Sequence, residues 1–203
     1  DQEIALYGAC GGENGAILIA GTGSICMGMD QERTWRAGGC GHLIDDEGSG
    51  YALGRDALRA VVRSFDGRSP STLLTSLIME EWKISGREEL IRRVYDAPDK
   101  SLVASLSPLV ERAGHMGDAA AMDIIEKGAA GLLELVLTVQ RQLSLSYMPL
   151  SLMGGLLTAD TLLKCRFLEG LARNAPGVEL RLPLADAASG AAMLAVREAQ
   201  AAM

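Results

Sequence analysis

Two glycine-rich stretches hold the residues with the clearest capacity for chemistry. The first is GTGS at residues 21–24, between the apolar runs GAILIA and ICMGMD. Glycine permits positive φ angles and close approach of the backbone to a ligand, and successive amide N–H groups can then converge on an anion. The hydroxyls of Thr22 and Ser24 add hydrogen-bond donors. The turn is therefore either an anion-binding loop or a tight connection in which the glycines serve geometry alone.

The second stretch, GGCGHLIDDEGSG at residues 38–50, combines five glycines with the acids Asp45, Asp46 and Glu47. Ionised carboxylates accept strong hydrogen bonds, as from sugar hydroxyls, and their oxygens also suit Mg²⁺. The alternative is a solvated acidic loop before a helix, where Asp46 and Glu47 would favour the positive end of the helix dipole.

A third glycine point is LMGGLL at residues 152–157, which follows an apolar run and precedes a helical pattern. The backbone of Gly154 and Gly155 could lie flat against a nucleotide. The same glycines could instead let a strand and a helix pack closely together.

The elements that must position these residues can be predicted from apolar periodicity and capping signals. Three strands at 15–20, 25–30 and 33–37 form an antiparallel meander. A helix over about 50–64 follows, with Ser49 as N-cap. The region 70–113 is helical in pieces, with Pro70 at a helix start. The remaining predicted elements are a helix at 117–144, a strand at 149–155, a helix at 159–173, a strand at 178–183 and a helix at 187–200.

Composition limits the class of protein. The 203 residues are 48% apolar and 22% charged, with a net charge of −7, which indicates a folded domain or lobe and argues against nucleic acid or an anionic membrane as partner. We see no signal peptide and no run long enough to span a bilayer, so a cytoplasmic location is expected.

The cysteines favour free thiols over a metal centre. No two of the four cysteines have CxxC spacing; they are Cys10, Cys26, Cys40 and Cys165. The sequence has two histidines, His42 and His115. We therefore expect no bound structural metal.

Taken in order, AGTGSI, GGCGHLIDDEGSGYALGRDALRA, LSLMGGLL and ASGAAMLA resemble the C-terminal lobe of the N-acetylglucosamine kinase family. This is also the BadF/BadG/BcrA/BcrD ATPase family, within the sugar kinase, actin and Hsp70 superfamily. The resemblance covers nearly the whole chain and is strongest at 15–64 and 149–157. It implies an α/β, ribonuclease H-like (actin-like ATPase) lobe over residues 1–203, with a mixed β-sheet and a helical insertion. The family's N-terminal lobe, with its DGGGT loop, is absent from these residues.

The resemblance also implies ATP with Mg²⁺, bound in a cleft between two lobes, and an amino sugar deeper in the same cleft. The residues expected to bind the nucleotide are Gly21, Gly23, Ser24, Gly154 and Gly155. The residues expected beside the sugar are Thr22, Gly39, Cys40 and Asp46.

Asp1 is the residue that the resemblance makes catalytic. The family has an aspartate at the start of a helix about twenty residues before GTGS, and DQEIALYGA matches that context. Asp1 would accept the proton of the attacking sugar hydroxyl, because phosphoryl transfer relies on positioning and on a carboxylate that orients the nucleophile.

Two positions depart from the family pattern. Cys40 stands where the family usually has tryptophan, so the shape of the sugar pocket is altered. Asp45 stands where the family often has glycine, and it would either change metal or phosphate tolerance or point to solvent.

The function implied is that of an ATP-dependent kinase acting on a hydroxyl of N-acetylglucosamine or glucosamine, with little activity from this lobe alone. Two alternatives stay open. One is an ATPase activator that holds an iron–sulfur cluster between two subunits, and the other is a non-catalytic module that binds sugar or nucleotide. The expected partners are the amino sugar, the missing N-terminal lobe and, because dimers are common among similar proteins, a second copy of the chain.

Overall fold

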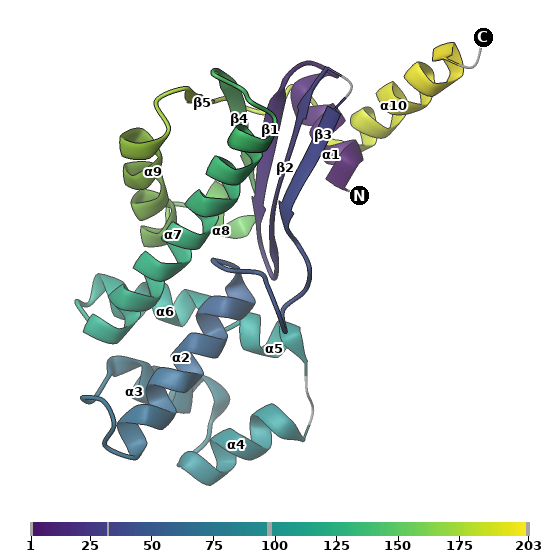
Figure 1. The fold of residues 1–203 in the computed structure, drawn as a ribbon. Helices are drawn as coiled ribbons and strands as arrows, with labels where there is room; N and C mark the ends of the chain where they lie inside the picture. Colours follow the sequence, from purple (N-terminus) through teal and green to yellow (C-terminus); the bar gives the residue numbers. More distant parts are fainter. Residues whose placement is uncertain (1, 32, 97–98, 202–203) are drawn as a thin grey trace.

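The computed structural model describes residues 2–31, 33–96 and 99–201 (Figure 1). Asp1, for which the family resemblance implies a catalytic role, lies outside the described residues. The predicted helix that follows it is present as α1 (Gln2–Cys10).

A five-stranded mixed sheet forms the centre of the described chain, with the strand order β3-β2-β1-β4-β5. Strands β1, β2 and β3 form the predicted antiparallel meander, whereas β4 and β5 add in parallel on the other side of β1. The strands are β1 (Gly15–Ala20), β2 (Ser24–Asp30), β3 (Arg33–Gly38), β4 (Met148–Met153) and β5 (Val178–Leu180).

The central strand β1 is buried on both faces. Leu18 faces the core beneath α7 (Ala119–Gln142) and α9 (Leu162–Asn174). Its neighbour Ile17 faces a smaller cluster beneath α1 on the opposite side of the sheet. This two-sided burial explains why the strand is a continuous apolar run and not an alternating one.

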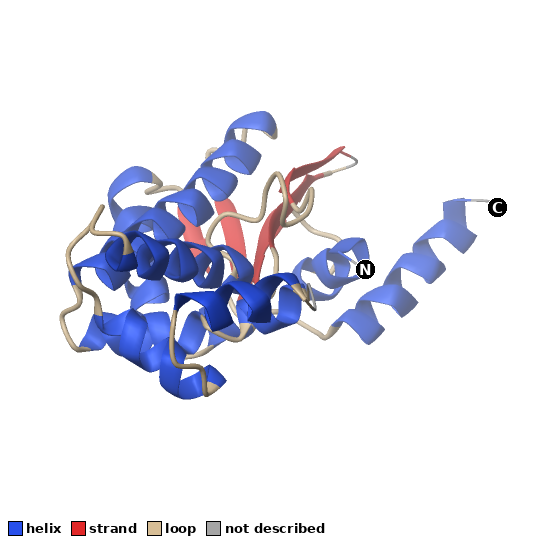
Figure 2. Ribbon diagram, turned by 90° about the horizontal axis from the view of Figure 1, so that it is seen from below, coloured by secondary structure: helices blue, strands red, loops and turns tan. Residues whose placement is uncertain are grey.

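The chain between β3 and β4 is helical where it is described. Its elements are α2 (Gly50–Phe65), α3 (Leu73–Trp82), α4 (Arg87–Tyr95), α5 (Lys100–Ala104), α6 (Ser107–His115) and α7. Seen from below, helices gather on one side of the strands, and α10 (Ala187–Ala201) extends away on the other side (Figure 2). Helix α10 packs along α1.

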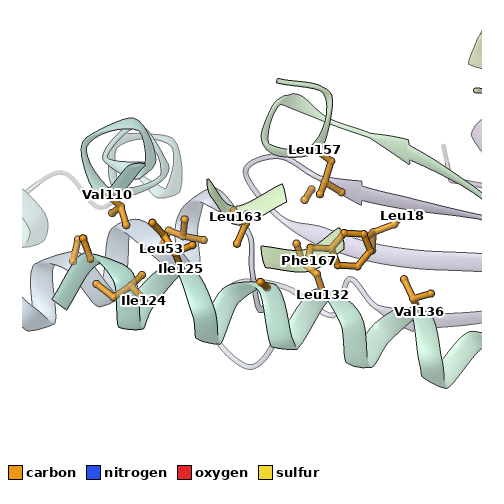
Figure 3. Close-up of a cluster of buried hydrophobic side chains, with 14 of the residues drawn as sticks. Leu18, Leu53, Val110, Ile124, Ile125, Leu132, Val136, Leu157, Leu163 and Phe167 are labelled. Atoms are coloured by element: carbon orange, nitrogen blue, oxygen red, sulfur yellow. The ribbon is translucent and has the colours of Figure 1, made fainter. Parts of the chain in front are cut away.

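Helix α7 joins the helical insertion to the sheet. Near one end its residue Ile125 lies close to Val110 of α6, and farther along Leu132 lies near Phe167 of α9 and Leu18 of β1 (Figure 3). All of these side chains are fully buried. Each contributes about 1.5–3 kcal/mol to folding through removal from water, so the insertion and the sheet share one continuous core.

The helix caps confirm some predicted boundaries and correct one. The Ser49 hydroxyl accepts a hydrogen bond from the Ala52 N–H at 3.1 Å, as predicted for the N-cap of α2. The prediction that a helix starts at Pro70 was wrong, because α3 begins at Leu73. Thr72 is the N-cap of α3, and its hydroxyl accepts the Leu74 N–H at 3.2 Å. The Asp118 carboxylate, which caps its own helix, also accepts the Leu73 N–H at 2.7 Å.

Candidate functional site

The glycine turn between β1 and β2 lies against the first residues of α2. The Gly50 N–H donates to the Gly21 carbonyl at 2.7 Å, and the Tyr51 N–H donates to the Thr22 carbonyl at 3.2 Å. These donors are free at the start of a helix, because they have no partner within it. The turn therefore serves as a cap for α2, and α2 in return fixes the position of the turn.

Asp46 holds the other side of the same turn. Its carboxylate accepts the Ser24 N–H at 3.3 Å, and the Ser24 hydroxyl donates to the Glu47 carbonyl at 2.7 Å. A Cβ placed on Gly23 would lie 3.0 Å from an Asp46 oxygen. A side chain at this position would crowd the buried carboxylate, which would have to shift by a few tenths of an ångström to accommodate it.

Gly154, in the third glycine-rich stretch (residues 152–157), lies against the strand that leads into this turn. It follows β4 with a φ of +86°, and a Cβ there would lie 2.3 Å from the Ala20 carbonyl oxygen. Gly155, at the start of α8 (Gly155–Thr158), has no atom within 4 Å of its Cβ position. The three glycine-rich stretches thus meet at the end of β1.

The donors available to an anion can be identified within the turn. The Gly21 N–H donates to the Gly23 carbonyl at 2.9 Å, and the Ser24 N–H and hydroxyl are engaged by the acidic loop. Within residues 2–31, 33–96 and 99–201, the N–H groups of Thr22 and Gly23 have no hydrogen-bond partner. Sequence reasoning did not separate these two amides from that of Ser24, because the contact with Asp46 is long-range.

The loop expected beside the sugar leaves the sheet next to the turn. Gly39 has a φ of +73°, and a Cβ there would lie 2.7 Å from the side chain of Ile25. Cys40 is exposed, and its N–H donates to the Asp45 carboxylate at 2.7 Å. Asp45 therefore closes this loop on itself. Thr22 is exposed at the tip of the glycine turn.

The two acids that flank Asp46 have opposed pKa shifts. Partial burial works against the charged form of Asp45, yet the hydrogen bond from the Cys40 N–H holds its pKa below the usual value. The Glu47 backbone N–H favours the charged form of its own side chain, but burial and the adjacent Asp45 carboxyl raise the pKa of Glu47. As pH falls, Glu47 takes up a proton before Asp45.

Sequence reasoning assigned no site role to His42, which lies in the loop after β3. The structure packs it edge-on against Tyr51, with ring centroids 4.6 Å apart and an angle of 70° between the rings. The prediction missed the role of Tyr51, whose backbone caps the turn while its ring supports the loop. The only sequence signal for this role is its position at the start of α2.

A family comparison decides between the possible classes for this arrangement. The model of the BadF/BadG/BcrA/BcrD ATPase family matches residues 1–195. The chain belongs to this family. The resemblance inferred from the glycine motifs is therefore confirmed.

Curated relatives of this BadF/BadG/BcrA/BcrD ATPase family chain are named as sugar kinases. This chain is 37% identical over 202 residues to the N-acetylmuramic acid/N-acetylglucosamine kinase of Clostridium acetobutylicum, and the match covers 98% of this chain and 66% of the relative. It is 33% identical over 203 residues to the N-acetyl-D-glucosamine kinase of Dictyostelium discoideum, covering 97% of this chain and 64% of the relative.

A solved structure confirms the fold class. A crystal structure from Chromobacterium violaceum, described as a candidate N-acetylglucosamine kinase, matches with a TM-score of 0.76 and 28% identity. The match covers 95% of this chain and 62% of that chain. The mixed sheet with its helices is the actin-like ATPase fold. The chain spans just under two thirds of the length of the relatives that it matches.

The states of the cysteines, of possible metal ligands and of the long helices can be given for this family member. Cys10 and Cys26 are buried, whereas Cys40 and Cys165 are exposed, and all four are free thiols. Across the described residues, no group of three or more His, Cys, Asp or Glu side chains could hold a metal ion. No described helix is both long enough and apolar enough to cross a membrane.

Proposed function

We propose that this chain is the C-terminal lobe of an ATP-dependent amino-sugar kinase, which transfers the γ-phosphate of ATP to a hydroxyl of N-acetylglucosamine or glucosamine. The names of the relatives support this activity. The observation that carries the proposal is the meeting of Gly23, Asp46 and Gly154 at the end of β1. An exposed tract of bare backbone beside a buried carboxylate suits an anionic phosphate chain next to a hydroxyl-bearing substrate.

In this proposal the glycine turn binds phosphate through its backbone. The unpaired N–H groups of Thr22 and Gly23 point the positive ends of their dipoles at the anion. Gly21 and Ser24 hold the turn in shape through their bonds within the turn and to the acidic loop. Gly154 and Gly155 offer a surface without side chains along which the nucleoside lies.

The substrate sugar lies on the loop side of the turn. The exposed Thr22 hydroxyl, the backbone of Gly39 and the side chain of Cys40 line it, and Asp46 stands at the junction between sugar and phosphate. Asp1 accepts the proton of the attacking hydroxyl, a contribution typically worth about 10²–10⁴-fold in rate.

Mg²⁺ accompanies the phosphates of ATP and neutralises their charge during transfer. The described residues contain no ready-made cluster of three ligands, which fits a cation held mainly by phosphate oxygens and water. The other lobe of the cleft, and the DGGGT loop expected in it, would come from sequence before Asp1. The part of each relative that lies outside the match is long enough to contain such a lobe.

The test is a coupled assay of ADP release with ATP, Mg²⁺ and a panel of amino sugars. We expect little turnover from these 203 residues alone and phosphorylation once the upstream coding sequence is joined to them. The matched variant is Gly23→Ala in the joined protein, which should lower turnover, with Gly86→Ala as the control, because the Cβ position of Gly86 is open and this residue lies at the start of α4, outside the proposed site. Full turnover by the isolated chain, or binding of ATP and sugar without turnover by the joined protein, would contradict the proposal.

A further inference from the structure

A groove in the helical insertion opens beside the loop that carries His42 and Leu43, and Tyr51 lines it as well. It lies between α2, α4 and α5 and has a volume of about 1200 Å³. Figure 1 places α4 at the outer edge of the insertion, away from the sheet. Within α4 only Leu90 is buried, so this helix stands off from α2 and leaves the space between them open.

The floor of the groove is aliphatic. Leu58, Val62 and Val103 line it from α2 and α5, and Val94 lines it from α4. Two further residues of α4 at its edge are unusually exposed for their type, Ile91 at 43% and Tyr95 at 76%. Contiguous apolar surface of this kind on a soluble fold marks a site that another molecule covers.

The rim of the groove is cationic in a chain whose net charge is −7. Five basic residues line the groove, namely Arg55, Arg59, Arg63, Arg68 and Lys100. They form an arc along α2, the turn after it and the start of α5. The concentration of positive charge is therefore local and is not a property of the whole surface.

The acids nearby compensate only part of this charge. Arg55 and Arg59 share the single carboxylate of Asp56, at 3.0 and 3.4 Å, and Arg68 pairs with Asp66 at 2.7 Å. Arg63 donates to a hydroxyl, not a carboxylate. Among the described residues, no ion pair engages Lys100.

One carboxylate, that of Asp99, also lines the groove, but it accepts the Ser101 N–H at 2.8 Å as the N-cap of α5. The arc thus retains positive charge beside the aliphatic floor. A small inorganic anion would leave that floor uncovered, and a neutral hydrocarbon would leave the cations without a partner.

We propose that this groove is a binding site for an amphiphilic anion, a molecule with an extended aliphatic body and a carboxylate head. The body lies between α2 and α4 on Val62 and Val94, and the head lies at the cationic rim, where Arg63 and Lys100 have no carboxylate partner among the described residues. Binding buries Ile91 and Tyr95 and draws α4 toward α2. The residues that hold the body and the head belong to none of the three glycine-rich stretches, so this binding does not depend on the proposed kinase activity.

The test is calorimetric titration of the chain with sodium dodecanoate at concentrations below micelle formation, without ATP or sugar. We expect saturable binding of one molecule per chain. Decanol provides an aliphatic body without a charge, and inorganic phosphate provides a charge without an aliphatic body. Each should bind at least about tenfold more weakly than dodecanoate, which corresponds to about 1.4 kcal/mol.

The decisive variant is the double charge reversal Arg63→Glu with Lys100→Glu. Both side chains are exposed, so the fold should survive, and thermal unfolding checks this. We expect dodecanoate to bind about tenfold more weakly or worse. The matched control is the double reversal Arg141→Glu with Arg173→Glu, which makes the same change in net charge at exposed positions outside the groove and should leave binding unchanged.

A second variant, Ile91→Ser, tests the aliphatic body without touching charge. Because Ile91 is already exposed, its replacement should reduce dodecanoate affinity and leave the unfolding temperature unchanged. Unchanged affinity in both the double reversal and Ile91→Ser, equal affinity for decanol, or no binding by the wild-type chain would each overturn the proposal.

Discussion

The glycine junction at the end of β1 and the groove beside α4 are held in opposite ways. At the junction, atoms of β1, the glycine turn, the acidic loop and the end of β4 meet so closely that a Cβ on Gly154 would collide with the Ala20 backbone and one on Gly23 would crowd the Asp46 carboxylate. At the groove, α4 is anchored by Leu90 alone and its other apolar residues face open space. The first region is fixed before any ligand arrives, whereas the second has room to change when a ligand binds.

The largest effect should come from breaking the junction with Gly154→Ala. The new Cβ would lie 2.3 Å from the Ala20 carbonyl oxygen at a φ of +86°, so both contact and backbone conformation are unfavourable. We expect a loss of about 4 kcal/mol in the free energy of unfolding, measured by urea denaturation. Gly155→Ala, one residue later, should cost less than about 1 kcal/mol. Equal costs for the two variants would mean that the junction is not sterically locked.

Removing the carboxylate that supports the turn should have the next largest effect. Asp46→Ala leaves the buried Ser24 N–H without its acceptor, and we expect a loss of about 2 kcal/mol by urea denaturation. Asp46→Asn keeps an acceptor oxygen and should lose less than half as much. If Asp46→Asn is as damaging as Asp46→Ala, the hydrogen bond to Ser24 is not what stabilises the turn.

Leu90→Ala tests the looser region. Because Leu90 is the one buried residue within α4, its loss should release that helix while the sheet stays folded. We expect hydrogen exchange to accelerate across residues 87–95 and the free energy of global unfolding to fall by about 1–2 kcal/mol. Exchange that accelerates equally in β1 would show that the two regions unfold as one unit.

Thiol chemistry gives the smallest and most local readout. Cys40, in the loop beside the turn, is exposed, whereas Cys26 in β2 is fully buried, and burial raises its pKa. At neutral pH we expect a thiol reagent to modify Cys40 and Cys165 quickly and Cys26 only after unfolding. Gly154→Ala should speed modification of Cys26 far more than Leu90→Ala does. The reverse order would contradict the contrast between the two regions.

Cys10 adds a pH dependence to the same experiment. Burial raises the pKa of its thiol from 9.0 to about 11, so the folded state holds this proton more tightly than the unfolded state does. The stabilising contribution is complete below pH 9 and is lost as pH rises toward 11. Between pH 7 and pH 10, ionisation of this thiol should lower the free energy of unfolding of the wild-type chain by about 1 kcal/mol. Cys10→Ala should abolish this part of the decrease, measured by urea denaturation at the two pH values.

Sequence reasoning succeeded where the signal is local. Strand β1 and its antiparallel partner follow from apolar runs on either side of a glycine turn, and the Ser49 cap follows from its position before an amphipathic helix. The start of α3 has a local signal that the prediction at Pro70 overlooked, because Thr72 caps this helix through the Leu74 N–H. The second acceptor at this helix start, the Asp118 carboxylate, lies 45 residues away along the chain and has no local signal. The four-residue helix α8 was missed because it is too short to show a period.

In the candidate site, too, features with local sequence signals were predicted and features set by long-range contacts were not. Glycine content marked the stretches that meet at the end of β1, since only glycine tolerates such contacts. The exchange of hydrogen bonds between Ser24 and the acidic loop was not predictable, because it joins residues 22 positions apart. The groove beside α4 was also missed, since the cations that surround it come from separate elements and have no common spacing.

The hydrogen bond from Gly50 to Gly21 has a consequence for how this chain can change in length over evolution. It closes a ring of residues that contains the β2–β3 hairpin and the acidic loop. Lengthening the hairpin at its distal end adds cross-strand residue pairs far from the hydrogen bond between Gly50 and Gly21 and leaves that bond intact. Insertion of one residue between β3 and Ser49 would instead displace Asp46 from Ser24. Natural length variation should therefore concentrate at the distal tip and be nearly absent from the acidic loop.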